Sequence, residues 1–317
     1  MISRRLLRIK VLKGLYGYIG GQRGSLVAAE KELALSIRKT YDQYNYLFWF
    51  VPLLQDLAIR RIDLGLQKHL PSEEELNPNT KFAENKVIKQ ISENAALIKF
   101  AEQNSVIMTD AASIIRKMYR NITKRDYFKE YMNDPVRSFA GDRRLVIDIL
   151  ETEFEDFEDL YNMLEEQSIY WTDEPEFVVS VIIKTVKTIR QDKPFELFPL
   201  FKNSDDAEFG RRLLRHAILN YDEYNETVDK FTPNWDLERI AFMDKITIVS
   251  AMSEIMEFPN IPVKVTLDEY IDLARYYSTP GSSVFVNGVL DRIVWDFGSK
   301  NLIRKEGSGL IDTVTEK

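Results

Sequence analysis

The sequence predicts an all-α protein made of long helices, and two observations carry this prediction. Helix-breaking residues are sparse, with only 13 glycines and 11 prolines in 317 residues. In most segments apolar residues recur every three to four positions, which is the spacing of one helix face. One β-branched run, residues 246–249, has the propensity of a strand, but a helix buried on all sides fits the pattern that precedes it better.

The helices expected in the first part of the chain begin at capping residues. Ser25 is an N-cap for a long helix that continues to Pro52. Asp134 followed by Pro135 pairs a cap with a proline at the first helical position. The helices expected in this part cover 3–19, 25–52, 79–102, a segment that begins at 134, 153–166 and 173–190.

The helices expected in the last third follow the same rules. Ser204 begins a long helix that continues past residue 220, and Asn234 caps another that reaches about residue 255. Thr266 and Glu269 have the spacing of a capping box. Ser282 begins a final helix that reaches about residue 297, and the mixture of glycine, serine and charge after it predicts a frayed tail.

The composition excludes several classes of chemistry. There is no cysteine, which excludes disulfides, cysteine–zinc sites, iron–sulfur clusters and a thiol nucleophile. Two histidines, His69 and His216, leave little for histidine-dependent catalysis or a zinc site. No nucleotide-binding, serine-hydrolase or metalloprotease motif is present. We therefore expect a protein with no catalytic residues, no metal and no cofactor.

Membrane insertion is not expected either. No apolar run approaches the ~18 residues that a membrane span needs. The cysteine-free composition fits a reducing compartment, so the expected location is the cytoplasm.

The charge is unevenly distributed along the chain. The net charge is −7, but residues 1–23 hold six basic groups and no acid, while residues 151–176 hold eleven acids and no base. On a helix Arg4, Arg5 and Arg8 project on one side, and Tyr16 lies two turns further on. Guanidinium groups bind phosphate and an aromatic ring stacks on a base, which suits single-stranded RNA. The alternatives are a basic helix that only solubilises its surface or pairs with the acidic block, and a membrane-surface helix.

The last expected helix has a second unusual feature. Asn287 and Asp291 lie one turn apart, and Gly288 lies between them in the helix interior, where glycine costs about 1 kcal/mol relative to alanine. A glycine here predicts a close approach by another helix or by a ligand. The simpler alternative is tight helix packing with a local hydrogen bond between Asn287 and Asp291.

These features coincide with a family resemblance. Residues 285–291, F-V-N-G-V-L-D, resemble the C-terminal signature of the transcription antitermination factor NusB. Residues 261–274 and 209–214 resemble the segments that precede it, and the arginines of residues 4–8 with the Leu-Tyr pair at 15–16 resemble the family's first helix. The opening residues look like those of the extended form found in Bacteroidetes-type bacteria. Gly14 departs from the alanine that is usual there, which should loosen the first helix slightly.

The resemblance covers residues 1–19 and 205–297 and implies a domain organisation. Residues 1–24 plus 200–298 would form the NusB-like RNA-binding domain. Residues 25–199 would be a helical insertion of unknown role, and residues 299–317 a flexible tail.

The resemblance also implies a function. Members of this family act without catalysis, pair with a small-subunit ribosomal protein (also called NusE), and bind boxA RNA in nascent ribosomal transcripts, which supports read-through by RNA polymerase. The first and last helices adjoin in that fold, so that residues far apart in sequence would share one RNA surface. The positions that match the family's RNA contacts are Arg4, Arg5, Arg8, Tyr16, Phe285 and Asn287.

Two other functions compete with this reading. NusB-like domains also occur in ribosomal-RNA methyltransferases, but those enzymes need a cysteine and a glycine-rich loop that this chain lacks. The stronger alternative is a helical scaffold in which the acidic block binds a basic protein and RNA binding is incidental.

Overall fold

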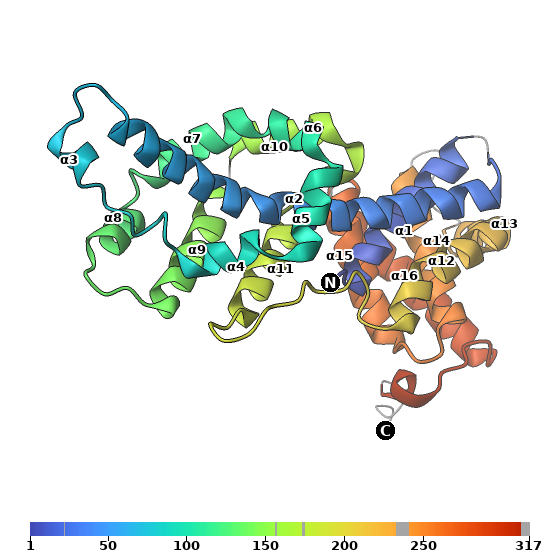
Figure 1. Ribbon diagram of the computed structural model, residues 1–317. Helices are drawn as coiled ribbons and strands as arrows, with labels where there is room; N and C mark the ends of the chain where they lie inside the picture. The colour runs from blue at the N-terminus through green and yellow to red at the C-terminus, as the bar shows by residue number, and fades with distance from the viewer. Residues whose placement is uncertain (22, 156, 173–174, 233–240, 312–317) are drawn as a thin grey trace. The chain divides into compact units, whose positions relative to one another are not determined.

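The computed structural model describes residues 1–21, 23–155, 157–172, 175–232 and 241–311. Throughout these residues the regular structure is helical and no β-strand occurs, which confirms the all-α prediction (Figure 1). None of the helices in this part of the chain is long and apolar enough to cross a membrane.

The chain divides into two compact units. We call Met1–Ile37 with Leu200–Lys317 the terminal unit, and Arg38–Pro199 the central unit. The division falls inside helix α2 (Leu26–Leu66), so the first three turns of this helix belong to the terminal unit. The resemblance instead places the start of the insertion at residue 25, one residue before α2 begins.

Helix α14 (Phe242–Glu257) is the centre of the terminal unit. It is buried along almost its whole length and packs against α1 (Arg4–Gly20), α12 (Ser204–Leu219), α13 (Tyr221–Phe231), α15 (Val263–Tyr277) and α16 (Ser282–Ser299). The β-branched residues 246–249 lie in this helix and are fully buried. The environment favours a helix because a helix satisfies its own backbone hydrogen bonds wherever it is buried.

Two expected features of the terminal unit are wrong. The helix from Ser204 does not continue past residue 220, because Asn220 separates α12 from α13. Thr266 is not an N-cap: α15 already begins at Val263, after Pro262, and the Thr266 side chain is turned into the core. The cap expected at Asn234 lies outside the described residues.

The segment after α16 differs from the frayed tail that the sequence predicts. Lys305 Nζ donates hydrogen bonds of 2.8 and 3.0 Å to the carbonyl oxygens of Ile255 and Phe258, at the end of α14. A Cβ atom at Gly309 would lie 2.0 Å from the carbonyl oxygen of Pro259, so only glycine fits this contact. Residues 300–311 are therefore anchored to the loop that follows α14.

The central unit is built around the rest of α2. Its helices are α3 (Glu73–Leu76), α4 (Lys86–Ser92), α5 (Ala95–Gln103), α6 (Ser105–Asp110), α7 (Ala112–Ile122), α8 (Asp126–Asn133), α9 (Phe139–Glu153), α10 (Glu158–Gln167) and α11 (Pro175–Thr188). Tyr46 and Phe50 of α2 are fully buried, and Tyr46 stacks on Trp171 with ring centroids 5.0 Å apart. These aromatic side chains form the core of the unit.

Three expected helix limits in the central unit are wrong. The helix α2 does not end at Pro52, which lies inside it and is buried. The stretch 79–102 is not one helix: it holds α4 and α5, and the side chain of Asn94 caps α5. Asp134 and Pro135 do not open a helix, because α9 begins at Phe139 after the cap of Ser138.

Candidate nucleic-acid interface

Helix α1 brings most of the predicted site residues to the terminal unit. Ser3 caps the helix by accepting a hydrogen bond from the backbone N–H of Leu6. Leu7 and Val11 are fully buried, and the helix packs on α12 and α14. Because one face is held in the core, the backbone positions of the residues on the other faces are fixed.

Arg4 and Arg5 lie at the start of α1 with partly exposed side chains. Arg4 Nε is 2.8 Å from Asp206 Oδ1, and its side chain is 39% exposed. Arg5 Nη2 is 2.7 Å from Asp272 Oδ2, and its side chain is 35% exposed. Each guanidinium carries five N–H donors, so a carboxylate orients the group without exhausting its donors. Both guanidinium groups are therefore oriented at the surface by their acidic partners.

Arg8 has a different environment from Arg4 and Arg5. Its Nε and Nη2 are each 2.8 Å from the carboxylate oxygens of Glu254, and the side chains of Arg8 and Glu254 are 4% and 0% exposed. The predicted contact between Arg8 and RNA does not match this geometry, because the guanidinium faces α14 and not the surface. In this structure Arg8 is a positioning residue for α1.

Glu254 connects the Arg8 pair to α15. Thr266 Oγ1 donates a hydrogen bond of 2.9 Å to Glu254 Oε1. The neighbouring Tyr270 is fully buried, and burial followed by the charge of Glu254 raises its pKa well above the ordinary value. The carboxylate thus ties α1, α14 and α15 together at one buried point.

The other end of α1 presents aromatic surface. Tyr16 is 44% exposed and its ring lies 4.9 Å from that of Phe242, at the start of α14. The ammonium group of Lys13 lies 5.6 Å from the centroid of the Tyr277 ring. Sequence reasoning did not select Lys13, although it belongs to the acid-free stretch of residues 1–23.

The start of α16 carries the remaining predicted residues. Phe285 is half-buried and Asn287 is exposed. The Ser282 hydroxyl donates a hydrogen bond of 2.9 Å to Asp244 Oδ2, which fixes α16 to the first turn of α14. No described side chain or distant backbone atom lies within 4 Å of a Cβ placed at Gly288, so close packing by another helix is excluded there.

Both ends of α1 contact α14, but at opposite ends of that helix. Arg8 meets Glu254 near the end of α14 and Tyr16 meets Phe242 at its start, so α1 and α14 run antiparallel. Asp244, in the first turn of α14, also holds α16. Tyr16 is therefore linked to the start of α16 through the first turn of α14, whereas Arg5 and Arg4 lie about 17 and 18 Å from Tyr16 along α1.

The first and last helices are joined through α14 more than through each other. The main neighbours of α1 are α12 and α14, and those of α16 are α13, α14 and α15. In the described part of the chain no group of three or more acidic or histidine side chains is arranged to hold a metal ion. The site thus offers guanidinium groups at one end and aromatic and amide groups at the other.

The chain is similar to known proteins over part of its length. A model of the NusB family matches residues 189–294. The transcription antitermination protein NusB of Salinibacter ruber is 37% identical over 121 residues, which cover 38% of this chain and 76% of that protein. No solved structure matches the chain.

The matches to two further relatives cover a smaller share of those proteins. The NusB protein of Chloroherpeton thalassium is 34% identical over 110 residues, or 35% of this chain and 52% of that protein. The NusB protein of Thermodesulfovibrio yellowstonii is 35% identical over 92 residues, or 29% of this chain and 61% of that protein.

Proposed function

Because this chain belongs to the NusB family of transcription antitermination proteins, we propose that it binds boxA-type single-stranded RNA together with the small-subunit ribosomal protein NusE. The family is non-enzymatic, in agreement with the sequence, which lacks catalytic motifs. In this proposal the protein acts in the cytoplasm as part of the complex that lets RNA polymerase pass terminators.

The observation that carries the proposal is the pair of preset arginines at the start of α1. Arg4 and Arg5 are more than one-third exposed and are held by Asp206 and Asp272. A phosphate would compete with these carboxylates for the guanidinium groups. Surface ion pairs of this kind contribute only about 0–1 kcal/mol, so sharing or exchanging a partner costs little. The acids thus orient the arginines without blocking them.

The remaining predicted residues have separate roles in this proposal. The ring of Tyr16 offers a face on which a base stacks, and the ring of Phe242 packs against the Tyr16 ring. Phe285 and Asn287 add an aromatic and an amide group at the start of α16, next to the same turn of α14. Arg8 acts indirectly, because its pair with Glu254 sets the position of α1.

The proposed domain roles keep the limits that the family resemblance implies. Residues 1–24 plus 200–298 form the RNA-binding domain, and residues 25–199 are an insertion that is not needed for the contacts described above. The ribosomal protein is expected to bind mainly through the C-terminal half of the family domain.

The scaffold alternative rests on the acidic block of residues 151–176. Part of the block is already used inside the central unit, because Asp159 pairs with Lys117 and Glu153 with Arg125. Other members are exposed: Glu151, Glu155, Glu158, Glu165, Glu166 and Glu176. A basic protein that binds the full chain through these six glutamates, with no effect of the first-helix arginines on function, would favour the scaffold.

The proposal is tested by reconstitution with purified components. The full chain is mixed with the ribosomal protein and a fluorescent RNA that contains boxA, and complex formation is followed by gel filtration and anisotropy. We expect a ternary complex that forms with the boxA RNA and not with a scrambled RNA of the same composition. Equal binding of the two RNAs, or no binding of either, would contradict it.

A further inference from the structure

The central unit has a strongly basic helix of its own. Residues 111–125, which include α7, hold five basic side chains and no acid. They lie in a chain whose net charge is −7, so the local excess is not a property of the composition. The bases fall into two groups, one paired with acids of the same unit and one not.

One group is neutralised inside the unit. Lys117 Nζ is 2.8 Å from Asp159 Oδ1, and Arg125 Nε is 2.6 Å from Glu153 Oε1. Both acids belong to the acidic block of residues 151–176. The block therefore accounts for these two cations.

The other group has no such partner. Arg116 and Arg120 lie one turn apart on α7, Lys124 lies in the turn that follows the helix, and all three are exposed. Among the described residues none of them has an acidic partner within 4 Å. The exposed Arg215 of the terminal unit shows the contrast, because it is paired with Glu30. We call Arg116, Arg120 and Lys124 the α7 cations.

Helix α2 adds two more guanidinium groups beside the α7 cations. The guanidinium carbon of Arg61 lies 4.8 Å from the centroid of the Tyr119 ring, which places α2 and α7 side by side at this point. Arg60 and Arg116 line the same cleft, of about 490 Å³. Arg60 is paired with Asp56, so its charge is partly offset.

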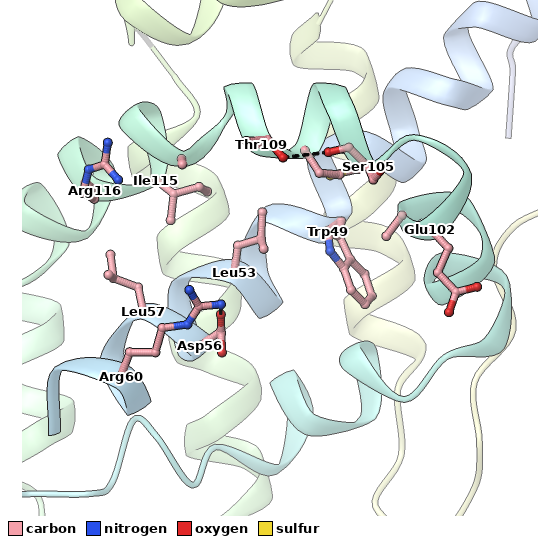
Figure 2. Close-up of a pocket in the computed structure, with 13 residues that line it drawn as sticks. Trp49, Leu53, Asp56, Leu57, Arg60, Glu102, Ser105, Thr109, Ile115 and Arg116 are labelled. Atoms are coloured by element: carbon pink, nitrogen blue, oxygen red, sulfur yellow. Dashed lines mark hydrogen bonds and ion pairs between the residues drawn. The ribbon is translucent and has the colours of Figure 1, made fainter. Parts of the chain in front are cut away.

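The cleft joins Arg116 of the α7 cations to an apolar surface that includes Trp49. Figure 2 shows Trp49, Leu53 and Leu57 following one another along α2, with α6 and α7 on the opposite side. All three side chains are only half-buried. Two acids also line the cleft: Asp56 is paired with Arg60, and Glu102 is the acid that an anionic ligand would have to avoid.

We propose that the α7 cations and the Trp49 cleft form a binding surface for single-stranded RNA in the central unit. Phosphates contact the α7 cations, and an unpaired base enters the apolar cleft and stacks on the indole ring. Stacking combined with a row of cations is the usual way to bind a single strand without reading its sequence. The surface needs no residue of α1 or α16, so the inference stands apart from the proposed boxA site.

Two other anionic partners fit less well. A membrane-surface helix needs large apolar side chains next to its cations. The other exposed positions of α7 are Ala112, Ser113 and Asn121, which cannot anchor in lipid. A duplex keeps its bases stacked on one another, so no base would be available for the Trp49 cleft.

The test uses the full chain and a fluorescent 24-nucleotide oligouridylate, which contains no boxA sequence. Arg4→Gln and Arg5→Gln are present in every sample, so that the first-helix arginines do not contribute. In this background the α7 cations are changed to glutamine together, and anisotropy is measured across a KCl series. We expect an affinity loss of about tenfold and a slope of log K against log[KCl] that is smaller by about 2, at ~0.7 per lost phosphate contact.

The matched control removes three cations elsewhere in the same unit. Arg144, Lys184 and Lys187 are exposed on α9 and α11, and their change to glutamine alters the net charge equally. The control should bind oligouridylate as tightly as the background chain. Equal losses in both variants, or no loss in either, would overturn the proposal, as would binding to phosphatidylserine vesicles without binding to oligouridylate.

The cleft is tested separately by Trp49→Phe and Trp49→Ala. The phenylalanine variant keeps a stacking face and should retain most of the affinity, whereas the alanine variant should lose about fivefold or more. Circular dichroism verifies that both variants are folded. An alanine variant that is folded and binds as tightly as the background chain would show that no base stacks on Trp49.

Discussion

Arg8 and Glu254 form a bidentate ion pair in which both side chains are almost completely buried, although 245 residues separate them in the sequence. Buried pairs of this kind stabilise little relative to well-packed apolar residues, but removing one partner leaves an uncompensated charge in the core. The pair therefore matters for where α1 lies. It also explains why an arginine at helical spacing from Arg4 does not reach the surface.

The first prediction concerns the stability of the folded chain. Arg8→Ala should lower the free energy of unfolding by about 3–5 kcal/mol, because Glu254 loses the partner that compensates its charge. Arg4→Ala, which breaks a partly exposed pair with Asp206, should cost about 1 kcal/mol or less. Urea denaturation measures both values. Similar losses for the two variants would contradict the structural role given to Arg8.

A second prediction concerns Gly288. Because open space surrounds this position, Gly288→Ala should raise the free energy of unfolding by about 1 kcal/mol, the ordinary gain from replacing an exposed glycine inside a helix. Gly309→Ala is the matched opposite: its Cβ would lie 2.0 Å from the carbonyl oxygen of Pro259, so this variant should be less stable. A Gly288→Ala variant that is less stable than the wild type, together with a Gly309→Ala variant that is more stable, would contradict the open space at Gly288 and the close contact at Gly309.

A third prediction concerns pH and the anchored segment after α16. Burial lowers the pKa of Lys305 from 10.5 to about 8, against the opposing charge of Glu254. Between these pH values the unfolded chain holds a proton that the folded chain has released, so stability should rise with pH. The stability of the wild type minus that of Lys305→Met should be larger at pH 9 than at pH 7.5. A difference that is constant, or that shrinks, would contradict this sign.

A fourth prediction concerns base stacking at the exposed end of α1. Tyr16→Ala should weaken the binding of boxA RNA by about 1–3 kcal/mol, the usual value of one stacked base, while Tyr16→Phe should bind almost as tightly as the wild type. Tyr16→Phe should leave the melting temperature nearly unaltered, whereas Tyr16→Ala should lower it slightly, because the alanine variant loses the ring contact with Phe242. Anisotropy with a labelled RNA measures the affinities. A phenylalanine variant as weak as the alanine variant would exclude stacking.

Local patterns in the sequence were enough to predict most of the fold. The spacing of apolar residues in α1 and the helix expected from Ser282 correspond to helices in the structure, and residues 246–249 are helical as expected. The errors occur where tertiary packing overrides a local signal. Pro52 lies inside α2. Thr266 has the spacing of a cap, but it lies within α15 and donates a hydrogen bond to Glu254.

The site could be predicted only in part. Helical geometry places Arg4, Arg5 and Arg8 on one side of α1, but it cannot reveal which part of that side faces Glu254. The open surroundings of Gly288 were equally hidden, because they depend on the positions of other helices. The anchoring of the last segment depends on Lys305 meeting the end of α14, a contact across about fifty residues that leaves no local pattern.

The most direct test of the proposed function is the salt dependence of boxA binding by Arg4→Gln, Arg5→Gln. The matched control is Arg211→Gln, Arg215→Gln, which removes two exposed, acid-paired arginines of α12. With the ribosomal protein present, the Arg4, Arg5 variant should bind boxA RNA more weakly, and its slope of log K against log[KCl] should be smaller by about 1.4, at ~0.7 per phosphate contact. The control should match the wild type. An Arg4, Arg5 variant with wild-type affinity and slope would contradict the assignment of this surface to RNA.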